Sequence, residues 1–211
     1  MTVALRTHCL TVALALSQLL SAQCAPQWQA GDPLPYVRGK VNATVTWDPD
    51  GAGPAPLLLV VGGSFAAGTL GPTSIATFDG SQWAALGTPP GEVTELIDWN
   101  GQLVAAVTTI NSDFIVQWNG TTWQTVGITS GYVHALGVFQ GELVVGGMLG
   151  DISSATSYAY VNNIARWNGS TWSALGSGVI GTVYALVVFI AIHGAHRIRV
   201  SRCGRRRTWT T

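Results

Sequence analysis

The chain has 211 residues, and glycine, with 26 copies, is well above its usual share of about 7%. Only 9% of the residues are charged, and residues 26–190 hold ten acidic and three basic side chains, a net charge of −7. Because the body is acidic, we do not expect its folded part to bind nucleic acid. The three cysteines, Cys9, Cys24 and Cys203, lie near the chain ends, so the fold should rest on its core and not on disulfides.

The N-terminal residues 1–25 have the pattern of a secretory signal peptide. Arg6 supplies the positive charge, residues 9–20 form an apolar run, and small residues between Ser21 and Ala25 offer a cleavage site. We therefore expect an exported protein that is extracellular, periplasmic or attached to the cell surface. Residues 27–31 (QWQAG) resemble a later outer-strand pattern and are either such a strand or an extended surface segment.

Three copies of one hairpin pattern organise the rest of the chain. Each has a central Asn-Gly or Asp-Gly pair, which favours a two-residue type I′ turn. Such a loop pairs Ala165 with Trp172, whereas a four-residue loop pairs Trp167 with Trp172 directly. Either loop places both aromatic side chains on one face, which predicts a structural hairpin core more than a platform for carbohydrate. The copies are 75–87 (IATFDGSQWAALG), 115–127 (IVQWNGTTWQTVG) and 164–176 (IARWNGSTWSALG).

Two further apolar runs accompany each copy, and they predict a first and a second strand. Their residues are apolar at both parities, so both faces of these strands should be buried. Four strands per unit, with sheets packed face to face, are typical of a β-propeller blade. The first strands are expected at 93–99, 132–139 and 182–189, and the second strands at 57–63 and 142–147.

The predicted fold is therefore all-β, a partial β-propeller of about three four-stranded antiparallel blades plus part of a fourth. The repeats span 26–189, with units at 41–87, 93–127 and 132–176 and a partial unit at 182–189. The basic stretch 190–211 breaks the pattern and is expected to lie outside the fold. Further hairpin units encoded downstream would show that the chain is a fragment of a longer protein, which is the interpretation we favour.

Each unit carries one local departure. In the first, Asp48 and Asp50 open like a calcium loop, but no acid completes the oxygen cage, so a turn is expected. The second has Ala105-Ala106 where the others have Gly62-Gly63 and Gly146-Gly147. The third inserts residues 150–162, which are polar and aromatic and are expected to be an ordered spacer, with a functional loop as the alternative.

The chain resembles kelch-type repeats, on the residues just described. Gly-Gly ends the second strand, an aromatic residue closes the third (Phe78, Trp118, Trp167), and a tryptophan follows in the fourth (Trp83, Trp123, Trp172). More narrowly, it resembles secreted bacterial repeat proteins of the WNGxxWxxLG type. The resemblance covers roughly 41–189 and implies a β-propeller. Copper-radical chemistry, which some kelch-like proteins perform, would need a Tyr linked to Cys and several His, and the repeats have no Cys.

No residue set carries a catalytic signature, so we assign no catalytic, cofactor-binding or metal-binding residue. His134 is expected to be a core histidine on a strand buried on both faces. His193 and His196 have metal-pair spacing, with Cys203 as the single nearby partner. Glu92, Glu95 and Asp98 cluster along one strand, which fits a solvated turn as well as a carboxylate pair.

We therefore expect an exported, non-catalytic binding or structural module. The alternative is a fragment of a secreted propeller enzyme that acts on carbohydrate, with its active site in missing blades. The sequence leaves protein and carbohydrate open as partners. An incomplete ring would leave apolar blade faces uncovered, which predicts self-association of the chain.

Overall fold

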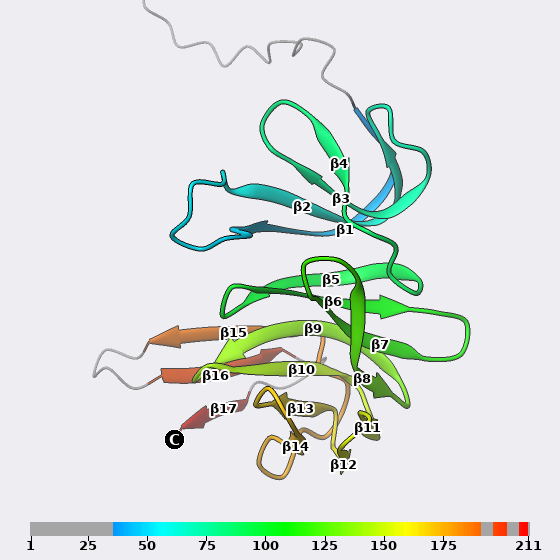
Figure 1. Ribbon diagram of the computed structural model, residues 1–211. Coiled ribbons are helices and arrows are strands. Elements are labelled where there is room, and N and C mark those ends of the chain that lie inside the picture. Colours follow the sequence, from blue (N-terminus) through cyan, green and yellow to red (C-terminus); the bar gives the residue numbers. More distant parts are fainter. Residues whose placement is uncertain (1–35, 191–195, 202–206, 211) are drawn as a thin grey trace, which may run out of the picture. The chain divides into compact units, whose positions relative to one another are not determined.

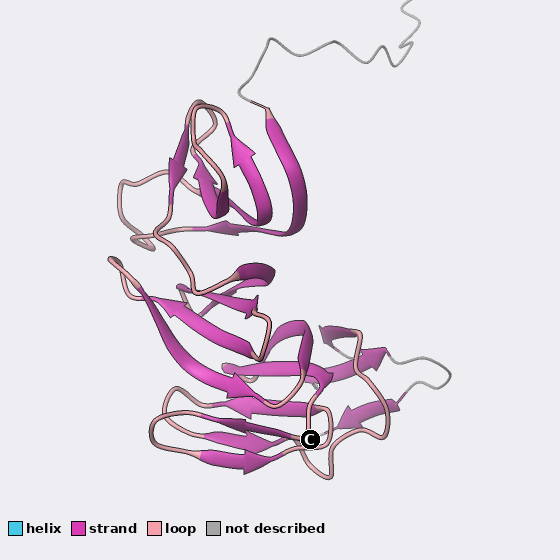
Figure 2. Ribbon diagram, turned by 90° about the vertical axis from the view of Figure 1, so that its right-hand side faces the viewer, coloured by secondary structure: helices cyan, strands magenta, loops and turns pink. Residues whose placement is uncertain are grey.

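The computed structural model describes the backbone of residues 36–190, 196–201 and 207–210, and the side chains of residues 36–188. Every described element is a β-strand, and the strands form antiparallel sheets of four, six, four and three strands (Figure 1; Figure 2). The all-β prediction is confirmed. None of the described segments is a helix long and apolar enough to cross a membrane. The predicted signal peptide and the strand at 27–31 lie outside the described residues.

The first sheet follows the predicted order, with each strand paired to the next along the chain. It is longer than predicted at its N-terminal end, because Val37–Val41 pair with Gly63–Ala67 beyond the expected limits. Its strands are β1 (Val37–Trp47), β2 (Leu58–Ala67), β3 (Thr73–Phe78) and β4 (Trp83–Ala85).

The second and third units repeat this four-stranded meander. The second unit comprises β5 (Glu92–Trp99), β6 (Gln102–Thr108), β7 (Asp113–Trp118) and β8 (Trp123–Thr129). The third comprises β9 (Tyr132–Phe139), β10 (Glu142–Met148), β13 (Ile164–Trp167) and β14 (Trp172–Ala174).

The insertion in the third unit forms a hairpin of β11 (Asp151–Ser153) and β12 (Tyr158–Tyr160). It pairs with the second unit, since Ile152 lies opposite Thr129 on β8. The second sheet therefore has six strands, in the order β12-β11-β8-β7-β6-β5. The backbone N–H of Trp172 donates to Ser157 Oγ, at 3.1 Å, which also ties the hairpin to its own unit. The expected spacer is thus an ordered cover for the edge of the neighbouring sheet.

A fourth sheet contains β15 (Ala185–Ile190), β16 (His196–Ser201) and β17 (Arg207–Thr210), with β16 in the middle. β16 and β17 belong to the stretch 190–211 that we expected to lie outside the fold. Their backbones differ from that expectation, because Ile190 pairs with His196 and Val200 pairs with Arg207. The predicted strand at 182–189 begins three residues later, at Ala185.

The hydrophobic core lies between consecutive sheets, and the second strands contribute to it from both faces. On β6, Leu103, Ala105 and Val107 join a buried cluster with Val60 and Trp47 of the first sheet. Val104 and Ala106, on the opposite face of β6, join a cluster with third-sheet residues that include Leu143. All five β6 residues from 103 to 107 are fully buried. Burial on both faces is confirmed for the predicted second strands, at residues 60–63 of β2 and 143–147 of β10. The same prediction is wrong for the first strands β5 and β9, where several side chains are only partly buried.

Tryptophan N–H groups link each unit to the next. Trp47 Nε1 donates to Gly101 O at 3.1 Å, and Trp99 Nε1 donates to Gly141 O at 2.8 Å, so the last residues of β1 and β5 bond the next unit's first turn. In the outer strands, Trp123 Nε1 donates to Leu86 O at 2.8 Å and Trp172 Nε1 to Val126 O at 2.7 Å. Each bond satisfies a donor that the core would otherwise bury without a partner.

The hairpin loops have four residues, so the expected two-residue type I′ turn is wrong. Trp167 pairs directly with Trp172, and their ring centroids are 5.0 Å apart. A type I′ turn needs positive φ at both central residues, whereas Gly169 has φ 101° and Asn168 is not among the positive-φ residues. The Asn168 Oδ1 atom instead accepts the N–H groups of Ser170 and Thr171, both at 2.9 Å. The Phe78–Trp83 and Trp118–Trp123 pairs have the same register, and all three aromatic pairs share a face as predicted.

Replacing Asn168 with alanine should lower the free energy of unfolding by about 1 kcal/mol, because two loop N–H groups lose their acceptor. Asn168→Asp is the matched control, since Asp79 does the same work in the first unit, where Oδ1 accepts from Ser81 and Gln82 at 2.8 Å. Urea unfolding followed by circular dichroism measures both variants. Equal losses for alanine and aspartate would contradict this role of the side chain.

Candidate functional site

Each first strand contains a β-bulge at the same place in its unit. On β1 the pairing steps from Val41 to Ala43, on β5 from Val93 to Glu95, and on β9 from Val133 to Ala135. One residue in each strand is therefore left unpaired: Asn42, Thr94 and His134. A bulge breaks the ladder and re-aims the side chain of the extra residue, and bulges are frequent beside active sites.

The position of the bulges shows that the sequence-based alignment of Ala105-Ala106 with the Gly-Gly pairs is wrong by one residue. Gly62 and Gly146 lie opposite Ala43 and Ala135, and the second-unit residue in that register, opposite Glu95, is Ala106. The second-unit counterpart of the Gly-Gly pairs is thus Ala106-Val107 and not Ala105-Ala106. A Cβ at Gly146 would lie 2.5 Å from Val183 Cγ1, and one at Gly62 would meet Val93. Glycine therefore allows the following unit's first strand to come close.

The sequence Val183-Tyr184-Ala185 has the same spacing at the start of the fourth sheet. Each of the four units therefore has a valine followed by a polar residue, and the polar residue differs from unit to unit. The next residue is alanine in three units and Glu95 in the second. We call the four polar residues the bulge row: Asn42, Thr94 and His134, which lie at the bulges, and Tyr184, which directly precedes β15.

Bulge-row residues connect neighbouring units. The Asn42 amide Nδ2 donates to Glu92 Oε1 and to Val93 O, both at 2.8 Å. The His134 ring stacks on Tyr184, with centroids 5.2 Å apart and an interplanar angle of 26°. Thr94 Oγ1 donates to Ala106 O within its own unit, at 3.3 Å. The row is thus held in place by contacts along and across the units.

Two hollows in the described part of the chain, of about 410 Å³ and about 310 Å³, lie beside charged side chains. The second lies at the bulges and is open to solvent; we call it the bulge hollow. Its lining includes Lys40 and Asn42 from β1, Thr94 and Glu95 from β5, and Tyr132 and His134 from β9. Polar side chains from three units therefore converge on one space.

The acidic residues that the sequence grouped together lie in different environments. Glu92 pairs with Lys40 (Nζ–Oε1 3.2 Å), and its pKa is lowered, first by the Asn42 hydrogen bond and then by Lys40. Burial raises the pKa of Glu95. Asp98 Oδ1 accepts the N–H of Gly101 at 2.7 Å and so belongs to a turn, as one alternative predicted. They do not form a pair of equivalent carboxylates.

Asp113 also lines the bulge hollow, and sequence reasoning did not single it out. It is 3% exposed, and its Oδ2 accepts the N–H of Val133 at 2.8 Å. Thr129 Oγ1 donates to the Asp113 carbonyl at 3.3 Å. Asp113 therefore fixes the start of β9 beside the bulge and positions His134.

Replacing Asn42 with alanine should raise the pKa of Glu92 toward its ordinary value of 4.5, because the largest cause of its lowering is removed. A lowered folded-state pKa stabilises the fold above the unfolded-state pKa, and this contribution is lost as the pH falls through the folded-state pKa. The variant should therefore lose less stability on acidification below 4.5. Carbon-detected NMR titration of Glu92 measures the shift, and Lys40→Ala should move it less. An unchanged titration in Asn42→Ala would contradict the assignment.

His134 is not buried on both faces, so that expectation is wrong. Buried and partly exposed side chains alternate along β9. His134 is one of the partly exposed ones, and it lines the bulge hollow. Tyr132, two residues earlier on the same strand, is 57% exposed. The side chains of His193, His196 and Cys203 lie outside the described part of the molecule.

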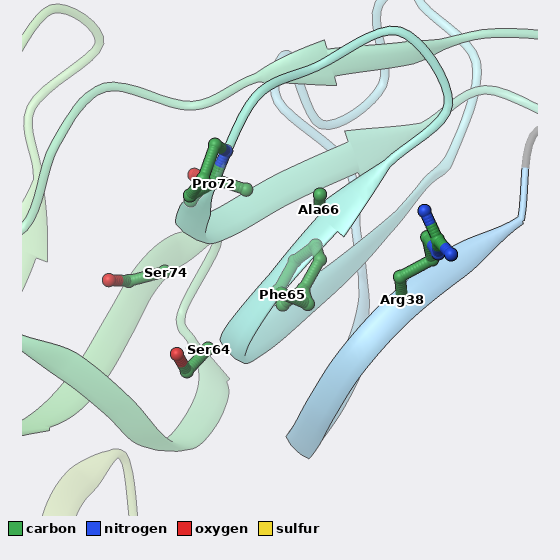
Figure 3. Close-up of a pocket in the computed structure, with 7 residues that line it drawn as sticks. Arg38, Ser64, Phe65, Ala66, Pro72 and Ser74 are labelled. Atoms are coloured by element: carbon green, nitrogen blue, oxygen red, sulfur yellow. The ribbon is translucent and has the colours of Figure 1, made fainter.

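The larger hollow lies on the first sheet and has different chemistry. Figure 3 shows Arg38 from β1, Phe65 from β2, and Pro72 and Ser74 from the β2–β3 connection and β3 around it. The guanidinium carbon of Arg38 is 5.6 Å from the centroid of the Tyr36 ring. Arg38 is the one titratable side chain in this lining, so the space offers little chemistry beyond an apolar wall and hydroxyl groups.

Asp48 and Asp50 act as turn residues, as predicted. Asp48 Oδ1 accepts the N–H of Asp50 at 3.3 Å, and Asp50 Oδ2 accepts the N–H of Ala55 at 3.0 Å. Within the described residues, no group of three or more His, Cys, Asp or Glu side chains is arranged to hold a metal ion.

The aromatic pairs of the second and third units pack against the preceding unit and do not offer a flat platform. A Cβ at Gly127 would lie 2.8 Å from Trp172 Cζ2, and one at Gly87 would lie 2.8 Å from Trp118 Cζ3. Trp167 and Trp172 are 6% and 4% exposed. These contacts favour the structural interpretation of the hairpin aromatics over carbohydrate stacking.

No family model and no curated protein matches the chain. Among solved structures, the chain is similar to the computationally designed Ika4 protein, at 15% sequence identity and a TM-score of 0.54. The similarity covers 85% of this chain and 98% of that chain. At this identity the likeness concerns the fold alone.

Proposed function

We propose that the chain is an exported module with a kelch-like, partial β-propeller fold that binds a partner and catalyses no reaction. Repetition of one four-stranded meander supports the fold, as does the burial of β6 and β10 between consecutive sheets. About three complete blades and part of a fourth account for the four sheets.

The bulge row is the observation that carries the binding function. The framework repeats from unit to unit, with the same bulge and the same preceding valine, while the bulged residue changes from Asn42 to Thr94 to His134. A constant scaffold with a varied set of polar residues on one hollow is typical of a recognition site.

The competing enzyme function, glycoside hydrolysis above all, would need two free carboxyl groups across the substrate. Around the bulge hollow, Glu92 is bound by Lys40 and Asn42, and the Asp113 carboxylate is buried against the Val133 N–H. Glu95 is left without a free carboxylate partner there. These contacts favour binding over hydrolysis at this place.

The exported protein should be screened against glycan and peptide arrays, and each hit titrated into wild type, His134→Ala and Arg38→Ala. Arg38 lines the other hollow, so Arg38→Ala is the matched control. We expect hits to lose at least about tenfold in affinity in His134→Ala, the loss expected for one charged or aromatic contact, and to keep their affinity in Arg38→Ala. Turnover of a hit, or affinities that His134→Ala leaves unchanged, would contradict the proposal.

A further inference from the structure

Glu95 departs from the repeat where the other units have alanine. Ala43 and Ala135 occupy the same register position, directly after their bulges and opposite Gly62 and Gly146. Ala185 follows Tyr184 with the same sequence spacing. A methyl group is enough for the framework at this position, so packing does not account for the carboxylate of Glu95.

The Glu95 side chain is half-buried, and no described residue donates a hydrogen bond to it. Taking a carboxylate partly out of water without a partner costs free energy. Its raised pKa reflects the same cost, because burial is its cause. A residue that destabilises the fold where alanine serves elsewhere is typical of a functional site.

The surroundings of Glu95 are negatively charged and partly aromatic. The bulge hollow contains the carboxylates of Glu95 and Asp113, while its ammonium group, on Lys40, is already 3.2 Å from Glu92. Tyr132 and His134 line the hollow, and the His134 ring stacks on Tyr184. Aromatic faces attract cations, most strongly where water is partly excluded.

We propose, building on the binding function above, that the bulge hollow takes a small organic cation, an ammonium or guanidinium group on a short chain, with the charged group on the Glu95 carboxylate. The volume of about 310 Å³ is at the lower end of the range for small-ligand pockets, about 300–1,000 Å³. This size fits one lysine or arginine side chain or a free diamine. Thr94 and Thr108 line the same hollow and supply hydroxyl groups for the remaining N–H donors.

The test is calorimetric titration of the exported chain with agmatine, with Nα-acetyl-lysine methylamide, and with a Gly-Lys-Gly peptide. The first probe represents a free amine and the other two represent a side chain of a peptide. The Nε-acetylated form of the lysine probe has the same chain without the charge. The variants are Glu95→Ala, Glu95→Gln and the control Glu142→Ala, which removes an equal charge from an ion pair with Arg166.

We expect the charged probes to bind wild type and Glu142→Ala alike and to lose at least about tenfold in affinity in both Glu95 variants, as expected for one charge-assisted hydrogen bond. The acetylated probe should bind at least about tenfold more weakly than the charged form, for the same reason. Glu95→Ala should melt at the same or a higher temperature, because the unpartnered carboxylate is gone.

Three results would overturn the proposal. Unchanged affinity in Glu95→Ala would show that the carboxylate does not bind the probe. A lowered melting temperature in that variant would show that Glu95 stabilises the fold. If the acetylated probe binds as tightly as the charged one and His134→Ala abolishes that binding, the ligand is not a cation, but the proposed binding function still holds. If no array hit and no probe responds to His134→Ala, both this inference and the proposed function fail.

Discussion

Replacing Trp172 with alanine is expected to lower the free energy of unfolding by about 3–5 kcal/mol, the range for a buried Trp truncated in a core. The side chain is 4% exposed and packs against the Trp167 ring, with ring centroids 5.0 Å apart and planes tilted by 37°. Its Nε1 donates to Val126 O of the preceding unit, at 2.7 Å. The substitution therefore opens a cavity and breaks a bond between two units at once.

Two controls separate these contributions. Trp172→Phe keeps most of the ring and loses the Nε1 donor, so it should cost about 1 kcal/mol plus a packing loss. Tyr160→Ala removes an aromatic residue that is 79% exposed on the adjacent β12, and should change stability by no more than about 0.5 kcal/mol. Urea unfolding followed by circular dichroism measures all three. A Trp172→Ala loss no larger than that of Tyr160→Ala would contradict the packing described here.

Gly146→Ala should destabilise the fold by about 1–3 kcal/mol, the usual cost of overpacking. Its new Cβ would lie 2.5 Å from Cγ1 of Val183, which is fully buried. Gly71→Ala is the matched control, because a Cβ at Gly71 would have no atom within 4 Å.

A double-mutant cycle sharpens this prediction. Val183→Ala removes the methyl groups that the new Cβ would meet, so the pair Gly146→Ala/Val183→Ala should be more stable than the sum of the single losses predicts. The coupling free energy should be at least about 0.5 kcal/mol, as for residues in direct contact. Strictly additive losses would show that the two positions do not touch.

The hairpins were predictable because their signals are local. Asn or Asp followed by Gly, with an aromatic residue on each side, defines a turn and two strands within 13 residues, as at 164–176. The length of the loop was not predictable. Asn168 can adopt positive φ or accept two N–H groups, and the sequence does not show which conformation is favoured. The structure has the second, which brings Trp167 opposite Trp172.

The insertion was harder to predict, because its strands are three residues long and pair with a strand from another unit. β11 meets β8 more than twenty residues back along the chain, so its partner is set by tertiary structure and not by local pattern. The signal that was present, Tyr158 and Tyr160 around Ala159, is an alternation of two residues and was too short to define a strand.

The candidate site depends on register, which the sequence shows only when the units are aligned with each other. Aligning Trp47, Trp99 and Phe139, the last residues of the first strands, places Asn42, Thr94 and His134 in one column. The same alignment sets Glu95 among alanines. Grouping Glu95 with Glu92 and Asp98 by proximity in the sequence hid this difference, because neighbours on a strand point to different faces and a bulge shifts the alternation.

The units pack one on the next and so bring their first strands to a shared hollow. NMR of the indole N–H groups tests this packing directly, because Trp47, Trp99, Trp123 and Trp172 each donate to a carbonyl of another unit. We expect these four protons to exchange slowly with deuterium and to show nuclear Overhauser contacts to Gly101, Gly141, Leu86 and Val126, respectively. Rapid exchange of the four protons, with contacts confined to their own units, would show that the units do not pack in this way.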